Sequence, residues 1–419
     1  MGGRLVWGGG TRMTRVQGPD EGSGAGEAHS RTHALTHPSP SPAAHPWHII
    51  TGEYPPRSGG IGEYTELLAH ALAAEGPRVH VWAPADASSE RRVEVHPAAF
   101  DREGLRQLDS GLGRFPSPRT LLVQYAPQAF GRRGMNVRFC RWVLSRARRG
   151  DQVRVMFHEP FVRFSIARPQ RNVLAAATRV MAGLLLRAAS VAYVSTPAWE
   201  RLLRPLAPRG LGPMRWLPIP STVPRVSDPE GVAVLRARLG ANRPGVHVVG
   251  HFGTYGGMIA PLLEPALLAV LAPPSTSVAL LLGDGGPEFA ERLRRVDPSL
   301  AGRVTAPGRL PREALSVHLQ ACDVAVQPYP DGVSARRTTA MAPLANGVPM
   351  VSNAGLFTEP QWEAAGIPLA PLPDAAALAA EALNLLDDAP RRRRLSASGT
   401  AFYEREFSMR RTLDVLLDE

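Results

Sequence analysis

The chain has 419 residues, of which 44% are hydrophobic and 20% are charged, a composition typical of a globular protein with buried cores and room for two domains. Its formal net charge is +11 and it contains no lysine, so arginine supplies the positive charge. This balance favours phosphate-bearing or polyanionic partners. The sequence lacks base-reading motifs with interleaved aromatic residues, which argues against nucleic-acid binding.

The cysteines, the apolar runs and the N-terminal segment indicate the cellular compartment of the protein. Two cysteines, Cys140 and Cys322, are too few for a disulfide framework or a metal motif. The longest apolar run, residues 173–195, is interrupted by two arginines and is too broken to span a membrane. Residues 1–44 lack the apolar core of a signal peptide and are predicted to be disordered. We expect a cytoplasmic protein, and a peripheral contact with the anionic inner face of a membrane stays open.

Strands and helices are predicted to alternate from residue 47 onwards. Residues 47–51 form a short apolar strand, followed by glycines at 59, 60 and 62, a helix, and a strand over 79–83. Such a glycine-rich turn lets backbone N–H groups approach a ligand, although Glu63 breaks the dinucleotide-binding fingerprint. Further strands are predicted over 120–125, 153–157, 191–195 and 214–219. With a helix over 172–189, this order is typical of an α/β domain with a parallel sheet.

A second series of strands follows the proline-rich segment 220–229, which we interpret as a connector between domains. Strands are predicted over 246–252, 277–282, 304–306, 324–327 and 348–351, and helices over 312–321, 375–386 and 403–417. Glycine-rich loops follow the first two of these strands. Ligands of open parallel sheets bind at the carboxyl ends of the strands, so these loops are candidate binding segments.

The segment 327–353 is predicted to form a strand, a loop, a helix and another strand. Ser334 is expected to cap the helix, which places Arg336 and Arg337 in its first turn. A cation at this positive end of a helix is an electrostatic misfit that a bound phosphate would relieve. The alternative is a pair of solvated arginines.

The layout resembles that of a GT-B glycosyltransferase of the retaining family-4 type over residues 47–415. The resemblance rests on YPPRSGGIGEYTELLAHAL near the start, LLLGDGGPE at 280–288, PGRLPREALSVHLQACDVAVQP at 307–328 and MAPLANGVPMVSN at 341–353. It implies an α/β GT-B fold in which two Rossmann-like, doubly wound parallel-sheet domains face a central cleft. The acceptor domain would span 45–222 and the donor domain 223–395, with a terminal helix in 396–419 packing back on the first domain.

This chain departs from the family pattern at two places. The family carries two glutamates eight positions apart, where this sequence has Ser334 and Ala342. The family also places an arginine and a lysine after the first strand of the donor domain, where this sequence reads HFGTYGGMI. Arg336 and Arg337 are therefore expected to hold the donor diphosphate, since a guanidinium suits phosphate oxygens.

The resemblance and the strand ends together select candidate site residues. His158 and Glu159 are the candidate catalytic residues; the alternatives are a histidine bound to loop backbone and an exposed carboxylate. Gln124 and Tyr125 are expected to face the acceptor. The candidate donor-binding residues are Gly60, Gly62, Gly253, Thr254, Tyr255, Ser334, Arg336, Arg337 and Thr338.

The expected reaction is transfer of a sugar from a nucleotide diphosphate donor to a hydroxyl of a sugar, glycolipid or small metabolite, with retention. The sequence has no Asp-x-Asp motif, so we expect no metal and no cofactor apart from the donor. The alternative metal set is Glu159, Asp284 and Asp331. Two other functions stay open: a GT-B nucleotide-sugar epimerase, and a non-catalytic nucleotide-sugar-binding protein, which the absent glutamates would suit.

Overall fold

The computed structural model describes residues 46–56, 59–84, 92–131 and 134–418. The extension over residues 1–44, which the sequence predicts to be disordered, lies outside the described residues. Among the described helices, none combines the length and the apolar character needed to cross a membrane.

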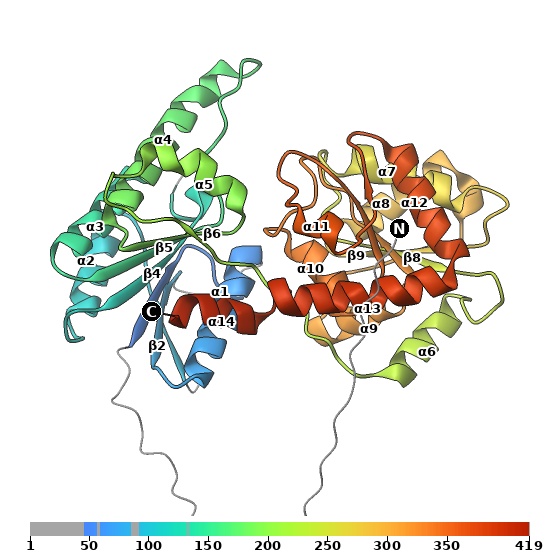
Figure 1. Ribbon diagram of the computed structural model, residues 1–419, viewed down its shortest axis with the longest axis horizontal. Helices are drawn as coiled ribbons and strands as arrows, with labels where there is room; N and C mark the ends of the chain where they lie inside the picture. Colours follow the sequence, from blue (N-terminus) through green and yellow to red (C-terminus); the bar gives the residue numbers. More distant parts are fainter. Residues whose placement is uncertain (1–45, 57–58, 85–91, 132–133, 419) are drawn as a thin grey trace, which may run out of the picture. The chain divides into compact units, whose positions relative to one another are not determined.

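The first sheet has seven strands in the order β3-β2-β1-β4-β5-β6-β7, and each neighbouring pair is parallel (Figure 1). Its strands are β1 (Trp47–Thr51), β2 (Val79–Ala83), β3 (Val93–Pro97), β4 (Thr120–Tyr125), β5 (Gln152–Phe157), β6 (Val191–Val194) and β7 (Arg215–Trp216). The strand order reverses between β1 and β4. Ligands of such sheets bind outside the carboxyl ends of the strands at this reversal.

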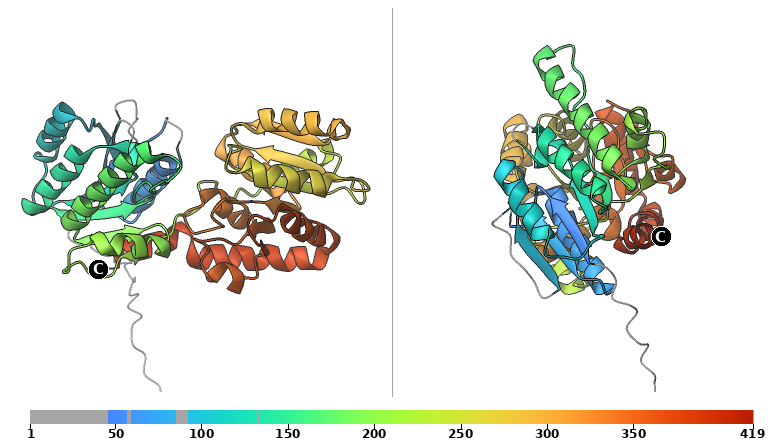
Figure 2. Two further views of the ribbon diagram at one scale, coloured as in Figure 1. Left: turned by 90° about the horizontal axis from the view of Figure 1, so that it is seen from above. Right: turned by 90° about the vertical axis from the view of Figure 1, so that its left-hand side faces the viewer.

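Helices cover both faces of the first sheet (Figures 1 and 2). They are α1 (Gly60–Ala74), α2 (Arg102–Leu112), α3 (Val137–Arg148), α4 (Asn172–Ala188) and α5 (Pro197–Leu203). Ile49 and Ile50 are neighbours on β1 and point to opposite faces, so each belongs to a different core. The core around Ile49 includes Tyr64 and Leu68 of α1, whereas the core around Ile50 includes Phe139 of α3.

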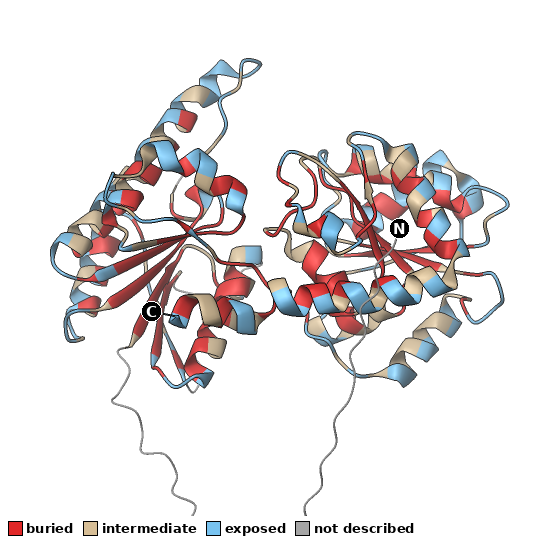
Figure 3. Cartoon of the chain, viewed as in Figure 1, coloured by how far each residue is buried: buried red, intermediate tan, exposed pale blue. Residues whose placement is uncertain are grey.

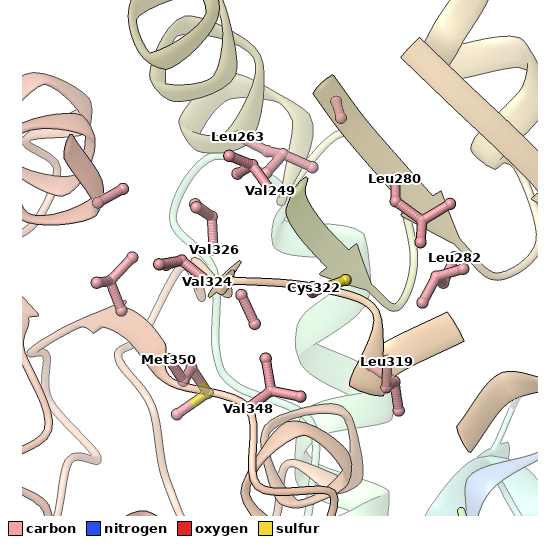
Figure 4. Close-up of a cluster of buried hydrophobic side chains, with 14 of the residues drawn as sticks. Val249, Leu263, Leu280, Leu282, Leu319, Cys322, Val324, Val326, Val348 and Met350 are labelled. Atoms are coloured by element: carbon pink, nitrogen blue, oxygen red, sulfur yellow. The ribbon is translucent and has the colours of Figure 1, made fainter. Parts of the chain in front are cut away.

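The second sheet has six parallel strands in the order β10-β9-β8-β11-β12-β13. They are β8 (Val248–Phe252), β9 (Val278–Leu282), β10 (Val304–Gly308), β11 (Val324–Val326), β12 (Met350–Asn353) and β13 (Leu369–Ala370). The order reverses between β8 and β11. Figure 4 shows part of its core, in which Val249, Leu280, Val324 and Met350 of these strands pack together with Leu263.

The helices around the second sheet are α6 (Pro229–Arg238), α7 (Ala260–Leu271), α8 (Gly286–Val296), α9 (Arg312–Gln320), α10 (Thr338–Ala345), α11 (Gln361–Ala364) and α12 (Ala375–Asp387). Helix α7 packs beside α12, and α10 packs beside α9 and α13 (Ala389–Glu406). Strands of both sheets are largely buried, while most helices keep an exposed outer face and α10 is almost wholly buried (Figure 3).

The chain ends in two helices, where the sequence predicts one over 403–417. Helix α13 ends at Glu406, and α14 (Met409–Leu417) starts anew, with Ser408 accepting a hydrogen bond from the N–H of Arg411. Leu413 and Leu416 of α14 join the core around Ile49. The proposed domain limits at 222 and 395 stay predictions.

One strand of the first sheet, β3, and three helices beside it, α2, α3 and α5, are absent from the sequence prediction. Strand β3 lies at the sheet edge and only Val93 in it is buried, so it lacks the apolar run that marks the other strands. Helix α2 begins where Asp101 caps the N–H of Gly104 at 2.8 Å, a signal that was present in the sequence.

Candidate active site

Loops at the carboxyl ends of both sheets surround a pocket of about 980 Å³. The loop after β1, the loops after β8, β9 and β10, and the start of α10 all contribute lining residues. Four predicted donor-binding residues line this pocket: Gly60, Gly253, Thr254 and Thr338. The structure therefore brings together residues that lie up to 278 positions apart in sequence, as Gly60 and Thr338 show.

Two helices present their N-termini to the pocket. Gly59 and Gly60 at the start of α1 line it, as do Thr338 and Thr339 at the start of α10. First-turn N–H groups have no acceptor within their own helix, and the helix dipole adds partial positive charge there. The pocket is therefore suited to an anionic group such as a phosphate.

Gly62 and Tyr255 have structural positions beside the pocket. Gly62 lies inside α1, where a Cβ would come within 3.1 Å of the backbone of Glu53 and Tyr54, so a larger residue would have to push the loop after β1 slightly away from the helix. The Tyr255 hydroxyl donates to the carbonyl of Leu282 at 3.1 Å, and burial raises its pKa far above the usual range. Neither residue is among those lining the pocket.

The expected helix start at Ser334 is wrong. Helix α10 begins at Thr338, and the residues before it form a turn in which Arg337 N–H donates to the carbonyl of Ser334 at 3.0 Å. Ser334 is fully buried, and its hydroxyl has no hydrogen-bond partner among the described residues. Arg336 and Arg337 thus precede the helix instead of lying in its first turn.

Asp331 forms an ion pair with each of the two arginines. Its two carboxylate oxygens each pair with one guanidinium group, of Arg336 and of Arg337. The Arg336 guanidinium also lies 5.3 Å from the ring of Trp199, and that of Arg337 lies 5.0 Å from the ring of Tyr329. The two arginines do not line the pocket; they share one carboxylate, Asp331, and the resulting surplus of positive charge is partly offset by Glu159, whose charge also acts on Arg336.

Sequence reasoning missed two arginines that do line the pocket, Arg309 and Arg312. Arg312 forms a close ion pair with Glu66, at 2.7 Å. Arg309 is 57% exposed and its ion pairs are long, 3.9 Å to Asp284 and 4.0 Å to Glu63. Arg309 follows the last residue of β10, so the strand-end argument applied to other loops would have identified it.

His158 is the first residue after β5, and it is buried. Its Nε2 lies 2.7 Å from Oε1 of Gln124, and its backbone carbonyl accepts from the Trp199 indole at 2.9 Å and from the Ser195 hydroxyl at 3.1 Å. Burial lowers the pKa of His158 to about 3, so the ring is neutral at physiological pH. Tyr125 is a core side chain, packed against the Phe157 ring.

The predicted catalytic and acceptor residues therefore lie near one another at the ends of β4 and β5. Gln124, Tyr125 and His158 are buried, Glu159 is exposed, and none of them lines the pocket. Their roles toward an acceptor stay predictions.

Glu159 has an acidic neighbour that the sequence prediction did not include. Glu159 accepts a hydrogen bond from the Gln128 side chain. Burial, and after it the charge of Glu159, raises the pKa of the half-buried Glu53. Glu53 lies against the glycine turn, because a Cβ on Gly59 would come within 2.4 Å of its Oε2. A carboxyl group with a raised pKa beside the pocket wall is a candidate proton acceptor.

A second buried carboxylate, Glu359, fixes the loop before α10. It accepts hydrogen bonds from the Thr196 hydroxyl at 2.6 Å, the Trp362 indole at 2.9 Å and the N–H of Ala335 at 3.1 Å. Burial raises its pKa despite these donors. Ala335 directly precedes Arg336, so Glu359 holds the backbone from which that arginine projects.

The alternative metal set does not assemble in the described part of the chain. Asp331 is occupied by its two arginines, and Asp284 is 70% exposed. Within the described ranges, the one group of three His, Cys, Asp or Glu side chains with converging ligand atoms is elsewhere, and it includes none of Glu159, Asp284 and Asp331.

No protein-family model and no curated protein matches this sequence. Solved structures do. Sucrose-phosphate synthase from Thermosynechococcus elongatus is 19% identical with a TM-score of 0.65, the match covering 90% of this chain and 97% of that one. HepE from Anabaena, solved with UDP and glucose, is 16% identical with a TM-score of 0.63, covering 90% of this chain and 99% of that one.

Two further structures widen the range of similar proteins. WaaG, a glycosyltransferase involved in lipopolysaccharide biosynthesis, is 13% identical with a TM-score of 0.62, covering 89% of this chain and all of that one. A candidate UDP-N-acetylglucosamine 2-epimerase from Listeria monocytogenes is 11% identical with a TM-score of 0.57, covering 89% and 95%. Identities this low establish the fold alone. With its two parallel sheets and these similarities, the chain has the GT-B fold.

Proposed function

We propose that this protein transfers a sugar from a nucleotide diphosphate donor to a hydroxyl acceptor. The observation that carries the proposal is the pocket of about 980 Å³, where strand-end loops of both sheets and two helix N-termini meet. A volume of this size suits a nucleotide sugar. The similar HepE was solved with UDP and glucose, which supports a donor of this class.

In the proposed reaction, the departing diphosphate is stabilised by N–H groups and by arginine. The Gly253–Thr254 loop and the start of α10 supply N–H donors, and Arg309 supplies an exposed guanidinium group whose ion pairs with Asp284 and Glu63 are long. Preorganised donors of this kind stabilise negative charge as it develops in the transition state. Retention of configuration and independence of metal are part of the proposal.

Arg336 and Arg337 have a supporting part in this scheme. Because both are paired with Asp331, their first effect is to hold the loop that leads into α10. The surplus positive charge of this group adds to the potential at the helix N-terminus. Direct contact with the diphosphate, as their sequence position suggests, requires one guanidinium to exchange Asp331 for phosphate.

On the acceptor side, we propose that Glu53 and Glu159 take up the proton of the attacking hydroxyl. Burial of Glu53, and after it the repulsion from Glu159, raises the pKa of Glu53 and so increases its basicity. His158, held neutral by burial, positions the strand ends instead of exchanging protons at physiological pH.

The acceptor could be presented at a membrane surface by the segment around the start of α4, which extends away from the first sheet (Figure 1). Phe164 is 56%, Ile166 fully and Val173 72% exposed there. Arg168 and Arg171 are also exposed, and residues 160–199 contain no acidic side chain. Apolar side chains among cations fit an anionic membrane surface, which supports peripheral attachment of a cytoplasmic protein.

A screen of nucleotide sugars tests the central proposal. Binding to the full chain is measured by calorimetry for UDP, GDP, ADP and TDP sugars, and turnover of the tightest binder is then followed by NMR with and without sugar and lipid acceptors. We expect one nucleotide diphosphate to bind more tightly than its nucleoside, and transfer only with an acceptor. An epimerised donor formed without acceptor would identify an epimerase, and binding without turnover a non-catalytic protein.

A further inference from the structure

Three side chains at the edge of the first sheet converge on one point. His80 lies on β2, and Glu94 and His96 lie on the edge strand β3. Nδ1 of His80 is 3.1 Å from Nε2 of His96 and 3.3 Å from Oε2 of Glu94. Nε2 of His96 is 3.9 Å from the same oxygen.

Strand register, and not a loop, creates this arrangement. In the parallel pairing of β2 with β3, His80 lies opposite Glu94, and Trp82 lies opposite His96. Residues two apart on a strand share a face, so Glu94 and His96 point to the same side as His80. The positions of the three groups are therefore fixed by the backbone of the sheet.

The separations fit a metal ion. In a tetrahedral site with bonds of about 2.0–2.2 Å, ligand atoms lie about 3.3–3.6 Å apart. The separation of 3.3 Å is at the lower limit of this range, 3.1 Å is just below it and 3.9 Å is above it, so small side-chain rotations would bring all three atoms to one ion. Two histidines and one glutamate, with solvent at the fourth position, form a known ligand set for zinc.

Hydrogen bonds within the cluster cannot satisfy all three side chains at once. Nδ1 of a neutral His80 ring carries either one proton or one lone pair, so it makes a hydrogen bond to His96 or to Glu94 but not to both. A metal ion accepts lone pairs from all three atoms at once.

Neighbouring rings hold the two imidazoles in place while leaving an entry path. The Trp82 ring stacks on that of His96 at 4.3 Å, and the Phe115 ring lies 4.4 Å from that of His80. The side chain of His80 is 3% exposed, whereas those of His96 and Glu94 are 28% and 59% exposed. Among the described residues, the cations Arg78 and Arg114 act on these imidazoles; both are exposed, so solvent screens their repulsion of an ion.

We propose that His80, Glu94 and His96 bind a divalent first-row transition metal ion of the zinc class. The ion would tie the edge strand β3 to β2. Imidazole nitrogens select such ions over Mg²⁺ or Ca²⁺, which prefer oxygen ligands. The three residues share no member with the lining of the pocket, so the site is separate from the proposed sugar transfer.

The test measures Zn²⁺ bound to the full chain after EDTA treatment and desalting. Equilibrium dialysis with elemental analysis gives the stoichiometry, Co²⁺ absorption reports the ligand geometry, and melting curves report stabilisation. The variants are His96→Gln and Glu94→Gln. His318→Gln is the matched control, because it removes a partly exposed imidazole from α9 instead.

We expect wild type and His318→Gln to bind one more Zn²⁺ per chain than the two site variants, or to bind it at least about tenfold more tightly. Zn²⁺ should also raise their melting temperature more. Four histidines at positions 29, 33, 37 and 45 are present in every variant, so ions bound there cancel in the comparison. Equal Zn²⁺ binding in wild type, His96→Gln and Glu94→Gln would overturn the proposal. Glu94 is exposed on an edge strand, so its variant should fold even if His96→Gln does not.

Discussion

Oε1 of Gln124 lies 2.7 Å from Nε2 of His158, joining the ends of the neighbouring strands β4 and β5 in a buried setting. An amide oxygen only accepts, so this contact places a proton on Nε2 of His158. A second proton would give the buried ring a positive charge that no solvent stabilises. For this reason burial lowers the pKa of His158 to about 3, against an ordinary value of 6.5.

This lowered pKa makes stability depend on pH. Between pH 6.5 and about 3 the unfolded chain binds a proton at His158 that the folded chain does not. The contribution of the neutral ring is thus complete above pH 6.5 and is lost as the pH falls, with a slope of up to about 1.4 kcal/mol per pH unit. We expect His158→Gln to flatten the loss of unfolding free energy between pH 7 and pH 5, measured by urea denaturation. His318→Gln is the control, and parallel pH curves for wild type and His158→Gln would contradict the expectation.

Arg309 should contribute more to nucleotide binding than the arginines before α10. Replacing Arg309 with Ala removes the least neutralised guanidinium of the pocket, and since the side chain is half exposed we expect a loss near 1.5 kcal/mol, or about tenfold in Kd for a nucleoside diphosphate. Nucleoside affinity should hardly change. Arg295→Ala, at an exposed site on α8, is the matched control.

For Arg336→Ala we expect chiefly a loss of stability, because Asp331 then keeps only Arg337 as a partner. If calorimetry instead shows that Arg336→Ala weakens diphosphate binding selectively while Arg309→Ala does not, the diphosphate lies against the arginines that the sequence first indicated.

Much of the fold, and part of the site, is readable from the sequence. Buried strands such as β4 and β9 contain runs of three or more apolar residues, and glycine loops such as Gly253–Thr254 follow strand ends, so their convergence could be predicted. Asp331 could not be matched to its two arginines, because that pairing depends on a turn that delays α10 to Thr338. Glu53 was missed because its raised pKa arises first from burial and then from the charge of Glu159, 106 positions away, and both depend on the folded structure.

Glu359 should stabilise the loop before α10. Glu359→Gln replaces one acceptor oxygen with an NH₂ group that faces N–H and O–H donors, and we expect a loss of about 1–3 kcal/mol in unfolding free energy. Thr196→Val removes one of these hydrogen bonds together with the cap of α5, in which the Thr196 hydroxyl accepts from the N–H of Ala198, and should cost about 1–2 kcal/mol. The N–H of Ala335 donates a hydrogen bond to Glu359, so the glutamine variant should also loosen the loop before α10 and thereby weaken donor binding. Unchanged stability in both variants would show that these contacts contribute nothing measurable.

The segment around the start of α4 should bind anionic vesicles. Ile166→Ser and Phe164→Ser remove exposed apolar side chains, so we expect reduced co-sedimentation with phosphatidylglycerol vesicles and unchanged melting temperature. Met258→Ser, at a site 69% exposed elsewhere in the chain, is the control. Binding of wild type should also fall with salt, since part of the attraction comes from arginines. Equal sedimentation of all four proteins would rule out this surface.

Turnover should survive removal of divalent metal. The proposed stabilisation of the leaving diphosphate comes from N–H groups at α10, the Gly253–Thr254 loop and Arg309, which are hydrogen-bond donors and not metal ligands. Of the acids that line the pocket, Glu66 pairs with Arg312, and Glu63 and Asp284 lie 4.0 and 3.9 Å from Arg309; none of the three belongs to a group of converging ligand atoms in the described chain. We therefore expect initial rates of the correct donor and acceptor pair to be unchanged in excess EDTA.

EDTA is expected to have a second effect, which distinguishes the proposed zinc site from a catalytic metal ion in the pocket. EDTA should lower the melting temperature of wild type if Zn²⁺ occupies His80, Glu94 and His96, and leave that of Glu94→Gln unchanged. Rates are therefore measured well below both melting temperatures. A rate that disappears with EDTA in wild type and in Glu94→Gln alike, and returns with Mg²⁺ or Mn²⁺, would place a catalytic metal in the pocket and refute metal-independent transfer.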